Sequence, residues 1–573
     1  MAKVTIVEDP VSGKGKTVEV ENGTTIIRAA AQAGVEIPHF CWHPGLSIAG
    51  NCRMCLVEIE KMPKLAIACA TQVADGMVVH VNSEKAVEAR KAVLEFILIN
   101  HPLDCPICDE AGECNLQDYT YSHGPGHSAL EEAKNKKPKR VPLGPNVVYD
   151  AERCIMCSRC IRFMDEIAKE PTLTFVERGD RVYIDTFPGK ELNNPYSMNV
   201  IDLCPVGALT NRDYRFKARV WETSSTEGIC TGCSRGCNTN IWVRNNEILR
   251  LTPRLNSEVN NYWICDNGRL NSFGHVNSEK RLNSPLVRKD GALQEAGWDE
   301  ALASLASAAD ALKPFSRDEV AVIGSPYSSV EDNYVLQKFA KQVLGTTNID
   351  FLQHSINGDE DTFLIRADKT PNAYGAREVG VSSSKGTDVK KIFELIGSGK
   401  IKALYVMDDD IATSKETEEL LARLDVLIVN HWVESKTTQL ADIVFPSATF
   451  AEKYGTYVNF LGRVQLSRPA VSTLEQERVP GRFNMSRLDN FGSAFDKWNK
   501  GQRRNVRSSW EIISAVANLL GGKIRFQSAQ KVFDEVAQTN PSFKGLSYAK
   551  IGAKGAPLSK GPVGKKSKEE TLV

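Results

Sequence analysis

The sequence predicts a multidomain chain that combines α+β and α/β parts. Its 573 residues are enough for about four domains. All 15 cysteines lie between Cys41 and Cys265, and none follows. After about residue 290, short apolar strands alternate with amphipathic helices, which is typical of an open, mostly parallel sheet. The two halves of the chain are therefore expected to differ in fold and in chemistry.

The composition is that of an ordinary folded protein, 42% apolar and 25% charged. Lys plus Arg and Asp plus Glu both number 71, so net charge gives no general attraction to nucleic acid. The longest apolar run, near Val93–Ile99, is far shorter than the roughly 20 residues that span a bilayer. The N-terminus lacks the apolar segment of a signal peptide. We therefore expect neither an integral membrane protein nor a secreted, disordered or collagen-like chain.

The first 60 residues predict a small β-grasp module. Residues 3–7 and 16–20 alternate like two strands of a hairpin. A helix is expected over Thr25–Ala33, ending at Gly34, and a strand over Val57–Glu60. A further helix is expected over Ser83–Asn100, with Ala86, Ala89, Val93 and Ile97 on one face.

The C-terminal half has the periodicity of an α/β domain. Ser328 and Glu331 have the spacing of a capping box before one of its helices. The predicted helices are Trp298–Leu312, Val330–Leu344 and Lys415–Leu424, and the predicted strands are Val320–Gly324, Ala403–Met407 and Val426–Asn430. Residues 544–573, rich in Lys, Gly, Ser and Pro, are expected to form a disordered tail.

The cysteines predict metal sites and not disulfides. With no export signal expected, the compartment is taken as reducing. An odd number of thiols also fits disulfides poorly. Clustered thiols in such a chain indicate either zinc or iron–sulfur clusters.

The first thiol set is Cys41, Cys52, Cys55 and Cys69. A Cys-x-x-Cys pair near a more distant thiol is typical of a loop around a binuclear cluster, and plant-type ferredoxins use a related spacing. Gly50 and Asn51 allow the loop to turn tightly. A zinc site with four cysteines is the alternative. His39 and His43 flank a set that is already complete, so we expect both to be structural or to contact the ligands without binding the metal.

The second thiol set has only three cysteines, Cys105, Cys108 and Cys114. His101 precedes them, and a neutral imidazole is a good ligand for iron or zinc. His101 can therefore supply the fourth bond, either to a cluster or to a Cys₃His zinc site.

The third and fourth sets have spacings typical of cubane clusters. Cys154, Cys157 and Cys160 with the remote Cys204-Pro205 form a ferredoxin-type motif for one [4Fe–4S] cluster. A two-cluster domain would need eight thiols there. The fourth set is Cys230, Cys233, Cys237 and Cys265. The four sets use every cysteine, which favours a chain of electron carriers over scattered structural thiols.

At these residues the chain resembles the G subunit (75 kDa subunit) family of NADH:quinone oxidoreductase, respiratory complex I. The resemblance covers roughly residues 1–470. The matching segments are Ala49–Glu58, His101–Gln117, Cys154–Cys160, Cys204–Leu209, Cys265–Arg269, Asn277–Leu282, Ala441–Pro446, Gly455–Asn459 and Gly462–Gln465.

The resemblance implies four clusters. The first set would bind a [2Fe–2S] cluster in a ferredoxin-like domain, and the second set, through His101 and its three cysteines, a [4Fe–4S] cluster. The third set would bind a second [4Fe–4S] cluster. The fourth would bind a further [4Fe–4S] cluster that only some bacterial members have and that lies off the main electron path. The C-terminal part would be a truncated molybdopterin-oxidoreductase-like α/β domain, with no molybdenum expected.

The resemblance also implies a function within a larger enzyme. Electrons would come from the flavoprotein NADH/FMN subunit and leave to a ferredoxin-like Fe–S subunit on the way to quinone, coupled in the complex to proton translocation. The chain would belong to an enzyme, NADH:quinone oxidoreductase, while having no catalytic residue or substrate site of its own. We expect a hetero-oligomer at the cytoplasmic side of the bacterial inner membrane, held there through its partners, with no direct membrane span and no nucleic acid.

The expected division of the chain follows these motifs. It comprises a [2Fe–2S] ferredoxin-like domain (1–80), a His-Cys₃ segment (81–125), a single-cluster ferredoxin-type domain (141–220), a fourth-cluster domain (223–285), an α/β domain (286–543) and the tail (544–573).

Three other classes remain as alternatives. One is the diaphorase-side subunit of an NAD-linked hydrogenase. Another is the large subunit of a formate dehydrogenase, which usually has eight cysteines in its ferredoxin segment and often a catalytic Cys or selenocysteine. The last is a scaffold held by zinc. Iron, zinc and molybdenum analysis separates these classes.

Overall fold

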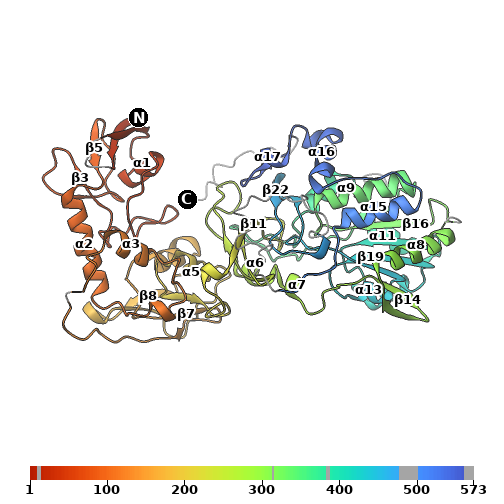
Figure 1. Cartoon of the computed structure of the whole chain (residues 1–573), viewed down its shortest axis with the longest axis horizontal. Coiled ribbons are helices and arrows are strands. Elements are labelled where there is room, and N and C mark those ends of the chain that lie inside the picture. The colour runs from red at the N-terminus through yellow and green to blue at the C-terminus, as the bar shows by residue number, and fades with distance from the viewer. Residues whose placement is uncertain (9–13, 129, 313–314, 383–387, 476–500, 560–573) are drawn as a thin grey trace. The chain divides into compact units, whose positions relative to one another are not determined.

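The computed structural model describes residues 1–8, 14–128, 130–312, 315–382, 388–475 and 501–559. The chain divides into two compact units, one of Met1–Glu222 and another that begins at Thr223. Figure 1 labels the elements of both units. Three thiol sets belong to the first unit and the fourth to the second.

The first unit begins with a five-stranded sheet in the order β2-β1-β5-β3-β4. The hairpin of β1 and β2 is antiparallel, and β5 runs parallel to β1. Apolar side chains of α1 and the strands form one core. The predicted hairpin, helix and strand are thus confirmed, with bounds β1 Ala2–Val7, β2 Gly15–Val20, α1 Ile26–Gln32, β3 Leu56–Ile59, β4 Ala66–Ile67 and β5 Met77–His80.

Helix α2, Glu84–Leu98, lies within the predicted range, and Ser83 caps it. Its buried face differs from the prediction, because Ala86, Arg90 and Leu94 are its buried residues. Arg90 is fully buried and donates to the carbonyls of Val81 and Leu56. Apolar periodicity alone could not reveal a buried arginine that satisfies loop carbonyls.

The rest of the first unit consists of short elements around the second and third thiol sets. A three-stranded sheet has the order β10-β7-β6, and β8 pairs with β9. The bounds are η1 Cys105–Ile107, α3 Asn115–His123, β6 Val141–Pro142, β7 Val147–Tyr149, α4 Arg159–Arg162, η2 Phe163–Ile167, β8 Leu173–Val176, η3 Gly179–Arg181, β9 Tyr183–Thr186, α5 Asn199–Leu203, β10 Leu209–Asn211 and η4 Val220–Glu222.

The second unit contains a seven-stranded sheet in the order β15-β14-β20-β19-β18-β16-β17. The five strands from β20 to β17 are parallel, which confirms the predicted open sheet. Helices α8, α9, α15 and α16 contribute to the apolar core on one face, and α11 and α12 contribute to the core on the other. Alternate residues of each strand face the two cores: Tyr405 belongs to one and Leu404 to the other.

These elements follow the predicted positions closely. Helix α8, strand β16 and strand β18 have the predicted bounds. The bounds are β14 Leu286–Lys289, β15 Ala292–Glu295, α8 Trp298–Leu312, β16 Val320–Gly324, α9 Val330–Lys338, η5 Phe339–Val343, β17 Ile349–Phe351, α10 Ala373–Glu378, α11 Val389–Gly397, β18 Ala403–Met407, α12 Lys415–Leu421, β19 Val426–His431, α13 Lys436–Leu440, β20 Ile443–Pro446, α15 Ser509–Leu519 and α16 Ala529–Thr539.

The predicted capping box was wrong by one residue. Ser329 caps α9 together with Asp332, whereas Ser328 donates to the carboxylate of Asp408 at 2.6 Å. Both pairs have the spacing of a capping box, so the sequence could not separate them. The helix also changes to a π-turn at Phe339, which shortens its α-helical part.

The predicted disordered tail was wrong for the residues up to 559. Helix α17, Tyr548–Ile551, and strand β23, Ala556–Pro557, are ordered, and β23 pairs with β22. Ile551 and Leu558 are buried in the main core of the unit, so a few apolar side chains outweigh the polar composition. Residues 560–573 lie outside the described part.

The second unit also has two three-stranded sheets, β11-β12-β13 and β21-β22-β23. Helix α6 follows the first of them and carries the last cysteine at its N-cap. The remaining bounds are β11 Ser224–Ile229, β12 Asn238–Arg244, β13 Glu247–Pro253, α6 Asp266–Asn271, α7 Gly274–Asn277, β21 Gly455–Val458, β22 Arg463–Ser467 and η6 Pro541–Phe543.

Candidate iron–sulfur sites

The first thiol set comes together in the loops around β3 and β4. The thiols of Cys52 and Cys69 hydrogen-bond with that of Cys41, and Cys69 does the same with Cys55. Hydrogen bonds from Cys52 and Cys69 hold the pKa of Cys41 far below its usual range. The backbone N–H of Cys41 also donates to Cys52 Sγ at 3.4 Å. Four thiols that share protons in this way form a compact donor set that can release them to a metal.

The loop of the first set turns where the sequence predicts. Gly50 has a φ of 64°, a left-handed conformation that suits glycine. The two flanking histidines make structural contacts, as expected. His39 Nδ1 lies 2.7 Å from the carbonyl of Ile37, and His43 Nδ1 accepts from the N–H of Gly45.

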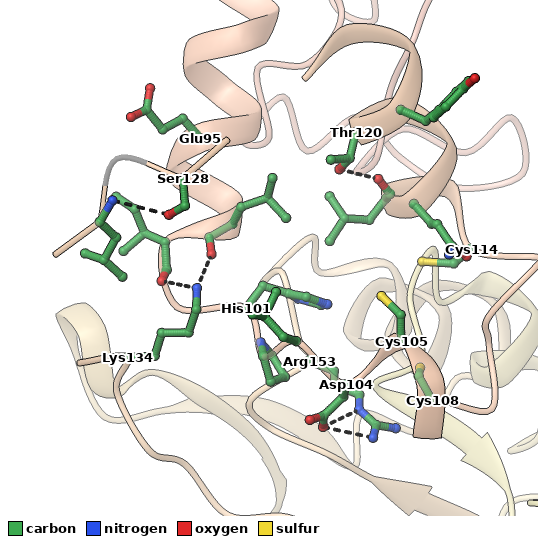
Figure 2. A pocket seen from close by; sticks show the side chains of 18 of the residues that line it. Glu95, His101, Asp104, Cys105, Cys108, Cys114, Thr120, Ser128, Lys134 and Arg153 are labelled. Atoms are coloured by element: carbon green, nitrogen blue, oxygen red, sulfur yellow. Dashed lines mark hydrogen bonds and ion pairs between the residues drawn. The ribbon is translucent and has the colours of Figure 1, made fainter. Parts of the chain in front are cut away.

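The second set lines a cavity of about 810 Å³ in the first unit. Figure 2 shows the His101 ring and the thiols of Cys105, Cys108 and Cys114 in the same part of this cavity. Cys105 begins η1, Cys108 ends it, and Cys114 precedes the first residue of α3. Two short elements, η1 and α3, and the segment after α2 therefore bring the four side chains together.

Two observations fit a bound group at the second set. His101 Nδ1 is buried and has no hydrogen-bond partner among the described residues. Burial lowers the pKa of His101 to about 4, so the ring is in the neutral form that ligates metals. A Cβ on Gly207 would lie 2.3 Å from Cys108 Sγ, so only glycine leaves this thiol its space.

The third set lines one small enclosed cavity with apolar neighbours such as Tyr149 and Ile184. Its loop needs left-handed backbone at Met156 (φ 56°) and Ser158 (φ 62°), neither of them glycine. Burial raises the pKa of Cys160 and Cys204 well above the usual range. A thiolate in so apolar a place needs a nearby positive charge, which a metal centre supplies.

The fourth set lies in the second unit, in the β11–β12 loop and at the N-cap of α6. Backbone N–H groups of Gly232 and Gly268 donate to the sulfurs of Cys230 and Cys265 at 3.4 and 3.3 Å. A Cβ on Gly268 would lie 2.9 Å from Cys230 Sγ. Glycines thus keep space for the sulfurs and supply N–H donors to them, as ligating thiolates require.

The predicted ligands gather in four sets. Among the described residues, no three His, Cys, Asp or Glu side chains are arranged to hold one metal ion. In a [4Fe–4S] cluster each thiolate binds a different iron, so its ligands stand apart by the width of the cluster. All 16 predicted side chains are described, and each lies with the others of its set.

The sequence missed the residues that join the loops of different sets. Arg159 and Arg162 of α4 donate to the carbonyls of Trp42 and Cys41 in the first-set loop. Asn51 Nδ2 donates to the carbonyl of Met156 at 3.2 Å. These contacts join residues more than 100 positions apart, and only the position of both arginines beside Cys160 could have drawn attention to them.

The carboxyl edge of the parallel sheet, where such folds bind ligands, is filled by its own side chains. Asp408, directly after β18, accepts hydrogen bonds from Ser328, Asn430, Ser447 and Ser509. A cavity of about 300 Å³ lies beside it. Its two lysines are engaged, Lys453 with Asp332 and Lys369 with Asp359. These groups do not fit a bound pterin cofactor, whose phosphate would need free cationic partners.

Profiles of five protein families match consecutive parts of the chain. They are a 2Fe-2S iron-sulfur cluster binding domain (residues 11–84), an NADH-ubiquinone oxidoreductase-G iron-sulfur binding region (90–129), the ferredoxin-like domain of NADH-quinone oxidoreductase subunit 3 (144–210), an NDSU1/NuoG-like 4Fe-4S domain (223–272) and molybdopterin oxidoreductase (281–379 and 371–479). The predicted fold class is thereby confirmed.

Curated relatives of the chain agree with these family profiles. The G subunit of NADH-quinone oxidoreductase from Rickettsia conorii is 43% identical over 58% of this chain, which spans only 49% of that relative. The mitochondrial 78 kDa subunit of NADH-ubiquinone oxidoreductase from Neurospora crassa is 32% identical over 92% of this chain and 83% of its own length. The 75 kDa subunit from Reclinomonas americana is 48% identical over 50% of this chain and 41% of its own.

A chain of an NAD⁺-reducing [NiFe]-hydrogenase structure is 28% identical and covers 38% of this chain and 90% of its own. Its TM-score is 0.32, too low to support an argument about fold or function. The Neurospora match extends over nearly the whole chain, and the family profiles cover each of the four thiol sets. The chain belongs to the G subunit family of NADH-quinone oxidoreductase, which includes the 75 kDa and 78 kDa subunits of NADH-ubiquinone oxidoreductase.

Proposed function

We propose that this chain is the iron–sulfur electron-transfer subunit of the peripheral arm of NADH:quinone oxidoreductase. It relays electrons from the NADH/FMN subunit toward quinone, and the complex couples this transfer to proton translocation. One observation carries the proposal: 15 cysteines and His101 form four separate sets with no cysteine left over. The family to which the chain belongs supports the same function.

The ligand assignment is part of the proposal. One [2Fe–2S] cluster is held by the first set and one [4Fe–4S] cluster by each of the other three. The ligands are Cys41, Cys52, Cys55 and Cys69; His101, Cys105, Cys108 and Cys114; Cys154, Cys157, Cys160 and Cys204; and Cys230, Cys233, Cys237 and Cys265. The division of the chain into six parts follows from these sets.

The side chains of this protein bind and shield the centres. When bound, iron–sulfur clusters accept and donate one electron at a time. Most of the thiols are buried away from water, and N–H groups such as those of Gly232 and Gly268 set the charge at sulfur. No residue need act as acid, base or nucleophile. As part of this proposal, no molybdenum is expected.

The partners and location are also proposed. We infer contacts with the flavoprotein NADH-binding subunit and with a ferredoxin-like Fe–S subunit, in a peripheral position on the cytoplasmic side of the bacterial inner membrane. In the described residues, no helix has the length and apolar character needed to cross a membrane. This agrees with attachment through partner subunits.

Metal analysis of anaerobically purified protein tests the proposal. We expect about 14 iron atoms per chain, one binuclear and three cubane signals by EPR after reduction, and no molybdenum. Zinc in place of iron would show a scaffold and overturn the proposal. Molybdenum with catalytic formate oxidation would favour the formate dehydrogenase class. NADH-driven hydrogen evolution by the purified complex would favour the hydrogenase class.

A further inference from the structure

A short helix connects the loops of the first and third thiol sets. Helix α4 begins two residues after Cys157 and contains Cys160. Arg162 donates to the carbonyls of Cys41 and Ser47, and Glu166 in the following π-turn accepts from the N–H of Ser47 at 2.8 Å. The third-set helix therefore holds the first-set loop at several points.

Arg159 takes part in both sets at once. Its side chain is buried, with 8% of the residue exposed. Nη2 donates to the carbonyl of Trp42 at 2.6 Å, next to Cys41, and Nη1 donates to the carbonyl of Leu203 at 3.2 Å, next to Cys204. The side chain also lines the cavity formed by the four thiols of the third set.

One donor of this guanidinium has no partner. Arg159 Nε is buried and makes no hydrogen bond among the described residues. A buried N–H without an acceptor is costly unless something else accepts it. The surrounding cavity is lined by thiols, so sulfur is the acceptor chemistry at hand.

The charge of Arg159 is not cancelled by its neighbours. Arg162 is a second cation on the same helix. The rings of His39 and His43 contact backbone groups of their own loop, the carbonyl of Ile37 and the N–H of Gly45. The carboxylate of Glu166 binds Ser47. The thiols of Cys157 and Cys204 line the same cavity as Arg159.

We propose that Arg159 is a positioning residue shared by the first and third centres, whose charge raises the reduction potential of both while its two Nη atoms fix their loops. This inference rests on the proposed function, because it needs the centres to be present. A nearby cation stabilises the reduced, more negative state of a cluster. One side chain would thus raise the reduction potentials of two neighbouring centres together.

The test is an anaerobic redox titration, followed by EPR, of the purified complex with Arg159→Gln, Arg159→Lys or Ser47→Ala. In Arg159→Gln we expect the ratio of reduced to oxidised centre at a fixed potential to fall about tenfold for both the binuclear and the third-set signals, which is about 59 mV for a one-electron centre. Arg159→Lys keeps the charge and should return both potentials toward those of the wild type. Ser47→Ala is the control, since it loosens the same loop without a change of charge.

Either of two results would overturn the inference. One is an Arg159→Gln protein with full iron content and an unchanged potential at either centre. The other is an equal shift in Ser47→Ala, because loosening of the loop would then suffice. If the Arg159→Gln protein does not retain both centres, the same redox titration of Arg162→Gln tests the proposal. The half-buried Arg162 donates to two carbonyls of the first-set loop and, in the third-set loop, to the hydroxyl of Ser158, so the binuclear potential should fall more than that of the third set. An unchanged binuclear potential in Arg162→Gln would contradict the proposal.

Failure of the proposed function would look different. Wild-type complex without iron–sulfur signals would remove the function and the inference together. Wild-type signals with unshifted variants would remove the inference alone.

Discussion

The imidazole of His101 stands where a fourth thiol would complete the second set. Neutral imidazole donates less charge to iron than thiolate does, and histidine ligation raises the potential of Rieske centres. The buried, unpartnered Nδ1 and the neutral state of the ring agree with this role.

Replacement of the imidazole by a thiolate should lower the potential of this one centre. In His101→Cys we expect iron content to be retained and the second-set potential to fall, because the added negative charge favours the oxidised state. An EPR-monitored titration measures this, with the other three centres of the same protein as internal controls. An unchanged second-set potential would argue against ligation by His101.

Loss of a thiol should have unequal effects in different sets. By resemblance to the family, the third set lies on the electron path and the fourth set off it. Cys160→Ala should therefore abolish NADH-to-quinone transfer, whereas Cys237→Ala should retain most of it. Both thiols are buried, so each comparison is made at equal assembly of the complex. Equal loss in two normally assembled variants would contradict the off-path position of the fourth set.

Residue types and spacings predicted all 16 candidate ligands, because cluster ligation demands thiols in short loops. The same spacings could not reveal Arg159 or Arg162. Their partners, the carbonyls of Trp42, Cys41 and Ser47, are backbone groups that every sequence has. Contacts to a distant backbone leave no pattern in one sequence.

At the scale of elements, helix α9 carries an unusual amount of buried charge. Every residue from Val330 to Leu336 is buried, including Glu331 and Asp332. Glu331 accepts hydrogen bonds from the N–H and hydroxyl of Thr456 and from the hydroxyl of Tyr548. Burial nevertheless raises the pKa of Glu331 to about 7.

This carboxyl group should make the second unit less stable as the pH rises. Below pH 4.5 Glu331 is protonated in both the folded and unfolded states, so its ionisation does not lower the free energy of unfolding. Between pH 4.5 and about 7 the unfolded state releases its proton first, and the free energy of unfolding falls, by about 3 kcal/mol once the pH exceeds 7. Urea unfolding of Glu331→Gln should lack this part of the pH dependence. Glu416→Gln, at an exposed position of α12, should keep it. The prediction would be contradicted if the free energy of unfolding varied with pH in the same way in both variants.

Element prediction succeeded where periodicity decides the structure. The bounds of α8, β16 and β18 were predicted because their apolar residues alone set the pattern. It failed at the cap of α9 and at α17, where polar partners or a few distant apolar contacts decide.

At the scale of the whole molecule, the chain separates its chemistry by unit. The first unit, Met1–Glu222, holds three thiol sets and has its own core in the N-terminal sheet. The second unit has the fourth set and a large sheet whose carboxyl edge is filled by its own side chains. The cysteine distribution predicted that the thiol sets lie before the α/β domain, whereas the structure places the fourth set in the same unit as that domain.

A chain that ends at Glu222 should therefore keep most of the iron. We expect it to fold, to bind about 10 iron atoms and to lack only the fourth-set signal, because the contacts that hold its three sets lie within the first unit. Iron analysis and EPR of the anaerobically purified fragment measure this. A fragment that loses third-set iron would show that this set depends on the second unit.

The uneven covering of the thiols has a practical consequence. Of the 15 cysteines, all within the described residues, Cys105 alone is exposed. Oxidants reach sulfur in proportion to its accessibility. When the protein is purified in air, the histidine-ligated centre should therefore be lost first. The stability of the preparation will then depend on this one centre while the other three centres are still intact.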